Sequence, residues 1–166
     1  MVRKPIHCRP AHFYGIILPQ LLRWEAAWHV WLATRHGVDR HCSGLLATGR
    51  SDLTVSIQGD SLSFRAIEIE RAEKRGARLL AVVHIGFDDL GDAADLIGRI
   101  RDGAPQAAIV LIVDEAILFH QAAELYRCCS QNQVDALVRT GFPDGRIPLR
   151  KTVERIMLYH DSRPVG

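Results

Sequence analysis

The sequence predicts a single α/β domain built on a doubly wound, five-stranded parallel sheet of order 2-1-3-4-5, with helices on both faces. Three observations support this prediction. Short, wholly apolar runs over residues 79–83 and 108–113 are typical of strands covered on both faces. Amphipathic segments of helical length separate such runs along the chain. The connections are short, which favours right-handed crossovers between parallel strands.

The composition fits one globular domain. The chain has 166 residues, of which 48% are hydrophobic and 24% charged, which argues against disorder. Residues 1–12 contain prolines, histidines and a cysteine, and they resemble an irregular basic arm. We therefore expect the arm over 1–12, one domain over 13–160 and a tail over 161–166.

The first half of the chain gives weaker patterns. Residues 13–18 form a short apolar run that ends at Pro19, which suits a buried strand. Residues 21–36 have helical spacing with Gly37 as a C-terminal stop, and residues 39–52 resemble a loop. Residues 53–57 alternate as a half-buried strand does, whereas 62–75 fit either a hairpin or a helix, and we favour the helix.

The second half gives clearer patterns. Strands are predicted over residues 79–83, 108–113 and 134–138. Helices are predicted over 92–101 and 115–129, and a last helix begins near Pro148, a residue that suits a first helical turn. Strands and helices thus alternate to the end of the chain, as a parallel sheet requires.

Charge and cysteine content favour an ordinary cytoplasmic protein. The formal net charge of +2 gives no indication of nucleic-acid binding. Cys8, Cys42, Cys128 and Cys129 lack the even spacing of a disulfide framework, and residues 1–12 lack the apolar core of a secretory signal. The apolar run around residues 24–33 is broken by Glu25 and His29, so we expect no membrane span.

Two segments resemble a known family. "RLLAVVHIGFDDLGDAADLIGRIRDGAPQAAIVLIV" is similar to the central third of a response-regulator receiver domain, and "VDALVRTGF" with the final helix is similar to its end. The likeness covers roughly residues 53–159. It implies a flavodoxin-like fold, and a site at the strand ends where a phosphoacceptor aspartate and an acidic pair bind Mg²⁺.

The residues expected at this site do not match the chemistry of the family. The acidic pair falls on Pro19 and Gln20, the acceptor on His84, the hydroxyl residue on Ile112 and the lysine on Arg139. Only the positive charge remains. The resemblance therefore implies a degenerate receiver pocket that binds no Mg²⁺ and takes up no phosphoryl group, unless a shifted alignment brings in Asp88 or Asp89.

Other candidate sites have plain structural alternatives. His84 is either a phosphoacceptor in its own right or, as we expect, a hydrogen-bonded structural histidine. Asp114-Glu115 follows a buried strand as in an NTPase, but no phosphate loop accompanies it, so a helix start is expected. We expect no metal site, although scattered residues have zinc-ligand spacings: His7, Cys8, His12, His36, His41 and Cys42.

Trp24, Trp28 and Trp31 would form one stripe on the predicted helix over 21–36. Two interpretations remain open. The stripe is either core packing beneath residues 39–52, or the face of a homodimer, with Trp31 facing outward.

Two functions follow from these patterns. The first is a non-catalytic, phosphorylation-independent signalling domain that acts on a protein partner or as a homodimer, without cofactor, membrane or direct nucleic-acid contact. The second is a small-ligand protein or enzyme with its site at the carboxyl ends of the strands. That rim would carry Gln20, His84, Asp88, Asp114 and Arg139. A deep polar pocket there would favour the second function, and a plugged rim the first.

Overall fold

The computed structural model describes residues 28–34, 48, 52–58, 69–70, 72, 74, 76–86, 90–140 and 146–163. The predicted arm over 1–12, the strand over 13–18, and Pro19, Gln20 and Trp24 lie outside the described residues. So do Asp88 and Asp89.

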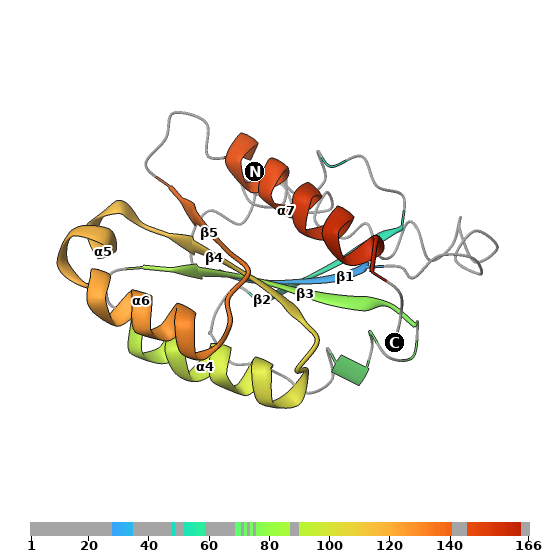
Figure 1. Cartoon of the computed structure of the whole chain (residues 1–166), viewed down its shortest axis with the longest axis horizontal. Helices are drawn as coiled ribbons and strands as arrows, with labels where there is room; N and C mark the ends of the chain where they lie inside the picture. The colour runs from blue at the N-terminus through green and yellow to red at the C-terminus, as the bar shows by residue number, and fades with distance from the viewer. Residues whose placement is uncertain are drawn as a thin grey trace, which may run out of the picture.

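The described part is built on a five-stranded sheet in the order β2-β1-β3-β4-β5, in which every neighbouring pair is parallel (Figure 1). This confirms the predicted fold class and strand order. The strands are β1 (Trp28–Ala33), β2 (Leu53–Gln58), β3 (Arg78–Ile85), β4 (Ala108–Val113) and β5 (Ala136–Arg139).

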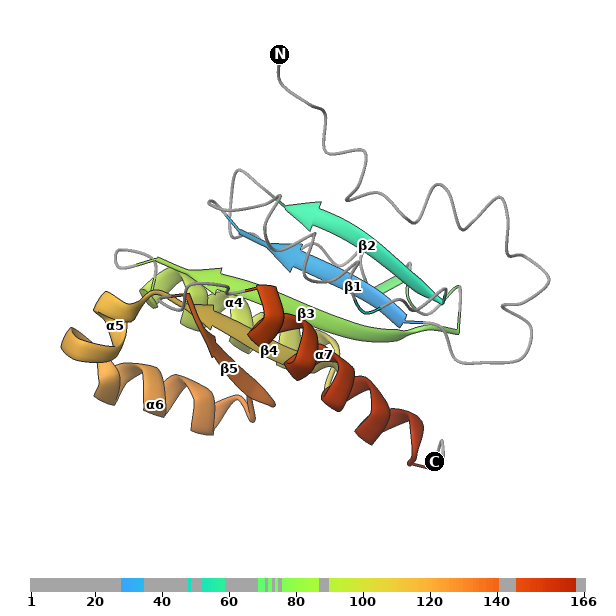
Figure 2. The same cartoon turned by 90° about the horizontal axis from the view of Figure 1, so that it is seen from above.

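Helices cover both faces of the sheet (Figures 1 and 2). One layer contains α4 (Leu90–Gly103), α5 (Glu115–His120) and α6 (Ala122–Gln131), and the other contains α7 (Arg146–Asp161). Among the described residues, no helix is long and apolar enough to cross a membrane.

The predicted helix over residues 21–36 is wrong for residues 28–33, which form strand β1. β1 lies between β2 and β3, and all six of its side chains are buried. β1 is covered on both faces and has one polar residue, His29, so its sequence shows no alternation that would reveal a period of two. The tryptophans at positions 24, 28 and 31 have the spacing of residues on one face of a helix, which favoured the helix prediction.

The tryptophan stripe is wrong for the same reason. Side chains alternate between faces along a strand, so Trp28 and Trp31 lie on opposite faces of β1. Trp28 packs in the core beneath α7, and Trp31 packs in the core beneath α4 and α6. Each is only 1% exposed, so Trp31 does not face outward and neither residue offers a dimer surface.

The other predicted elements agree with the structure. Residues 108–113 form β4 as expected, and 53–57 and 79–83 fall within β2 and β3. The strand predicted over 134–138 begins two residues later, as β5, and extends to Arg139. The described residues Ile69, Glu70, Ala72 and Lys74 are helical, in agreement with the helix predicted over 62–75. The helix predicted over 115–129 is interrupted at Gln121, where the backbone leaves helical geometry and separates α5 from α6.

Arg101 connects the end of α4 to the turn between α6 and β5. Its Nε donates to the carbonyl of Asn132 at 3.0 Å, and its two terminal nitrogens donate to the carbonyls of Pro105, Ala107 and Gln133 at 2.6, 2.9 and 3.1 Å. Gln133 has a positive φ of 50°, an uncommon conformation for a residue other than glycine. One guanidinium thus fixes two chain reversals.

Candidate functional site

Four polar side chains gather at the carboxyl ends of the strands. His84 lies near the end of β3, and Thr34, Asp114 and Thr140 directly follow β1, β4 and β5. Because all the strands are parallel, these ends meet at one edge of the sheet. The four positions continue the row of residues that faces α7, since His84 lies next to Ile112 in the ladder and Asp114 and Thr140 follow in the same alternation.

The four side chains form one chain of hydrogen bonds. The hydroxyl of Thr34 lies 3.1 Å from Nδ1 of His84, and Nε2 of His84 lies 2.9 Å from Oδ1 of Asp114. Thr140 donates its hydroxyl to the same carboxylate oxygen at 3.0 Å. The contacts connect the ends of β1, β3, β4 and β5 through side chains.

The chemistry of the groups assigns the donors in this chain. A carboxylate only accepts, so Nε2 of His84 carries the proton that reaches Asp114. In the neutral ring Nδ1 is then an acceptor, and the hydroxyl of Thr34 donates to it.

The order hydroxyl, imidazole, carboxylate is also that of a nucleophilic triad. Burial excludes this function for Thr34, because its residue is 0% exposed and His84 is 7% exposed. A nucleophile has to reach a substrate carbonyl or phosphorus atom from the solvent side. We conclude that the chain of bonds links the ends of four strands.

Arg139 lies at the end of β5 and contacts a different carboxylate. Its terminal nitrogen donates to Oε1 of Glu115, the first residue of α5, at 2.7 Å. Both side chains are about half exposed, at 46% and 48%, so the pair adds little to stability. Asp114 and Glu115 thus have different partners, one a histidine and one an arginine.

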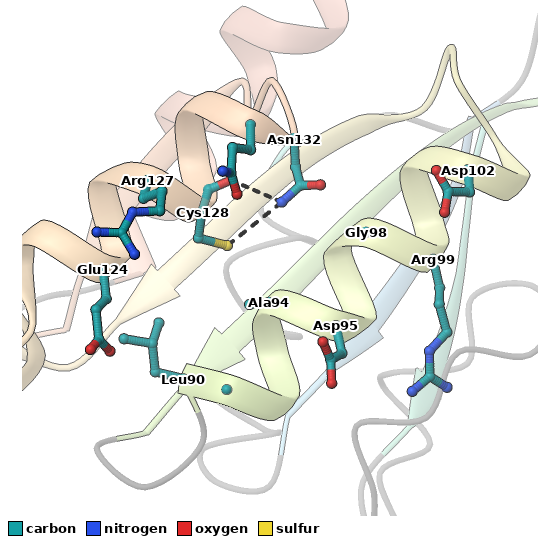
Figure 3. Close-up of a pocket in the computed structure, with 12 residues that line it drawn as sticks. Leu90, Ala94, Asp95, Gly98, Arg99, Asp102, Glu124, Arg127, Cys128 and Asn132 are labelled. Carbon is teal, nitrogen blue, oxygen red and sulfur yellow. Dashed lines mark hydrogen bonds between the residues drawn. The ribbon is translucent and has the colours of Figure 1, made fainter.

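A groove of about 540 Å³ lies between α4 and α6 (Figure 3). Gly91, Ala94 and Gly98 leave room on the α4 side, and Asn132 on the α6 side donates to the carbonyl of Cys128. Burial raises the pKa of the Cys128 thiol, against a smaller lowering by the hydrogen bond from Asn132. The charged groups along the rim are Asp95, Arg99, Asp102, Glu124 and Arg127.

A second, largely apolar cavity of about 290 Å³ lies between α6 and β5. Tyr126 and Leu137 belong to its lining and are 76% and 39% exposed. Cys129 also contributes, and burial raises the pKa of its thiol, with a further rise caused by the neighbouring Cys128. The lining includes neither His84 nor Asp114, so this cavity is separate from the strand-end chain.

The described residues contain no group of three or more histidine, cysteine or acidic side chains placed to hold a metal ion. The six residues with zinc-ligand spacings, from His7 to Cys42, lie outside the described part.

Known proteins resemble this chain in structure rather than in sequence. No family model matches it, and no curated protein does. The CheY-like protein TadZ from Pseudomonas aeruginosa PAO1 superimposes with a TM-score of 0.53 at 15% identity, over 80% of this chain and 97% of TadZ. The fold is receiver-like. RcsB, a response regulator from Salmonella typhimurium, gives a TM-score of 0.51 at 15% identity, over 84% of this chain and 64% of RcsB.

The receiver-like fold allows the expected site residues to be placed. His84 lies at the end of β3 as expected, and Arg139 ends β5. Ile112 is 1% exposed and lies beside His84 in the ladder, within the apolar layer beneath α7. Thr34, rather than Pro19, directly follows the strand that pairs with β3.

Sequence reasoning missed two of the four residues, Thr34 and Thr140, and it did not pair the other two. Thr34 was hidden because β1 was interpreted as part of a helix. Thr140 was not proposed as a site residue, although a hydroxyl residue directly after a strand was a usable signal. Asp114 was placed at the rim, but its partner His84 could only be identified once the register of β3 against β4 was known.

Proposed function

We propose that this chain is a receiver-like signalling domain that acts by protein contact and without phosphorylation. The observation that supports the proposal is the state of His84, the residue that the resemblance assigns to the position of a receiver's acceptor aspartate. Its ring is buried and both nitrogens are engaged, one with Thr34 and one with Asp114. A phosphoryl group on either nitrogen would have to replace one of these bonds, and the ring itself is only 7% exposed.

The carboxylates at the described strand ends also argue against a magnesium site. Mg²⁺ requires oxygen ligands in nearly octahedral geometry and gives up its waters reluctantly. One oxygen of Asp114 already accepts from His84 and Thr140, and one oxygen of Glu115 accepts from Arg139. Each carboxylate thus already has a protein donor that competes with a cation for its charge, and we propose that the domain functions without Mg²⁺.

The test is direct phosphorylation of the full chain. The protein is incubated with acetyl phosphate or phosphoramidate, with and without Mg²⁺, and intact mass is measured under neutral conditions. We expect no added phosphoryl group under any condition. A Mg²⁺-dependent adduct that disappears in Asp88→Asn or Asp89→Asn would overturn the proposal, and a Mg²⁺-independent adduct that disappears in His84→Gln would do so too.

The surface for protein contact that we favour is the cavity between α6 and β5. β5 is an edge strand of four residues, and the exposed Tyr126 stands beside an apolar hollow lined by Leu125, Val134 and Leu137. An apolar projection next to an apolar hollow is self-complementary about a twofold axis. We therefore propose a second copy of the chain as partner.

Sedimentation across a concentration series tests this partner. Tyr126→Glu should dissociate a dimer without unfolding the domain, because the side chain is 76% exposed. Arg99→Glu, on the exposed side of α4, is the control and should leave association unchanged. A monomer at high concentration, or a dimer unaffected by Tyr126→Glu, would remove a second copy as the partner at this surface.

A further inference from the structure

The outward face of α7 combines cations with exposed apolar side chains. At about 100° per residue, Lys151, Arg155, Leu158 and Tyr159 fall within a sector of about 100°, opposite the buried side of the helix. All four are exposed, with Leu158 at 66% and Tyr159 at 54%. Figure 2 shows α7 as the outer layer on its side of the sheet.

The charges on this face have one sign. Arg163 follows the helix, and its guanidinium lies 4.5 Å from the ring centre of Tyr159, which extends the cationic row to the end of α7. The acidic residues lie on the flank and have partners there. Glu154 lies 3.8 Å from Arg150, and Asp161 accepts from the indole nitrogen of Trp28.

The shape of this face selects among anionic partners. A helix surface is convex, so it has no groove to enclose an acidic peptide. A nucleic acid would engage Lys151 and Arg155 through phosphates but would bring no apolar surface to Leu158. A bilayer surface fits both properties, because apolar side chains enter the interface while lysine and arginine extend to the phosphate groups.

We propose that the outward face of α7 binds reversibly to anionic lipid bilayers. Leu158 and Tyr159 enter the interfacial layer, and Lys151, Arg155 and Arg163 contact lipid phosphates. This is surface attachment, so it requires no spanning helix. Each cation near an anionic membrane contributes about fivefold to the partition coefficient, so three cations and one leucine give weak binding that salt reverses.

The experiment measures co-sedimentation of the full chain with vesicles of phosphatidylcholine, with or without an equal part of phosphatidylglycerol. We expect binding only with phosphatidylglycerol, and loss of binding at high salt. Lys151→Glu/Arg155→Glu should weaken it by at least about 25-fold, since two cations are removed. Arg99→Glu/Arg127→Glu makes the same change of charge on α4 and α6 and should have a much smaller effect.

Leu158→Ser separates a bilayer from other polyanions. It leaves the charge unchanged, and at an exposed position it should not alter the melting temperature. We expect it to weaken vesicle binding severalfold and to leave any binding of a single-stranded oligonucleotide unchanged. The proposal is overturned if no vesicle binding occurs at low salt, if the two charge-reversed pairs behave alike, or if Leu158→Ser binds vesicles as the wild type does.

Discussion

Replacing Arg101 by alanine should destabilise the domain more than any other arginine substitution on α4. The side chain holds four backbone carbonyls, and the bonds to Asn132 and Ala107 are partly buried. Hydrogen bonds to a charged group contribute about 1.5–3 kcal/mol each when shielded, and the two exposed bonds contribute less. We expect Arg101→Ala to lower the free energy of unfolding by about 2–4 kcal/mol.

In a domain of this size that loss corresponds to a fall in melting temperature of roughly 5–15 °C. Urea unfolding followed by circular dichroism gives the free energy, and a thermal scan gives the temperature. Arg101→Lys keeps the charge but lacks the planar guanidinium, so its free energy of unfolding should lie between those of Arg101→Ala and the wild type. Arg99→Ala, on an exposed position of the same helix, should change stability by less than about 0.5 kcal/mol. An Arg101→Ala variant as stable as Arg99→Ala would refute the structural role assigned to the guanidinium.

Three further predictions test the core, the strand-end chain and the thiols. Trp31→Ala should lower the free energy of unfolding in urea by about 3–5 kcal/mol, because the indole is 1% exposed. A nearly unchanged free energy would show that Trp31 lies at the surface. His84→Leu should cost about 1–3 kcal/mol, since it leaves Asp114 without the ring that it accepts from; a gain in stability would show that the bond is dispensable. In a Cys128→Ser background, Cys129 should be alkylated more slowly at pH 8 than a small free thiol, with a rate that rises as the pH increases further, because burial raises its pKa; a faster reaction would contradict that shift.

The sequence was most informative where the apolar character and the length of a segment allowed only one type of secondary structure. Residues 108–113 form an apolar run too short for a helix and bounded by loop residues, and they form β4 with the predicted bounds. Gln121 was harder to predict, because nothing in an otherwise helical segment from 115 to 129 marks the break between α5 and α6. Local helix propensity predicts that residues 115–129 are helical, but it does not predict the position at which one helix ends and the next begins.

β1 shows where such reasoning stops. Its six residues are all buried, so apolar character carries no information about period, and two tryptophans three positions apart suit either a helix face or opposite faces of a strand. Only pairing with β2 and β3 decides between them. The first strand was predicted over residues 13–18, whereas β1 spans Trp28–Ala33. The first strand end was therefore expected at Pro19, and Thr34 was not identified.

The strand-end chain itself depends on register. His84 and Asp114 are 30 positions apart in the sequence, and they meet because the parallel ladder places Ile112 beside His84. A shift of one residue would turn the Asp114 side chain to the opposite face of the sheet. Sequence patterns identify the residue types at a strand end, but they do not fix this alignment.

The most direct test of the proposal that this strand end takes up no phosphoryl group is titration with beryllofluoride and Mg²⁺, followed by amide and imidazole NMR. Beryllofluoride mimics an acyl phosphate and binds where an acceptor carboxylate and its metal are available. Our account predicts that the signals of His84, Asp114 and Thr140 do not move as both reagents are added. Saturable, Mg²⁺-dependent shifts at these residues would contradict it and would show a working phosphoacceptor site.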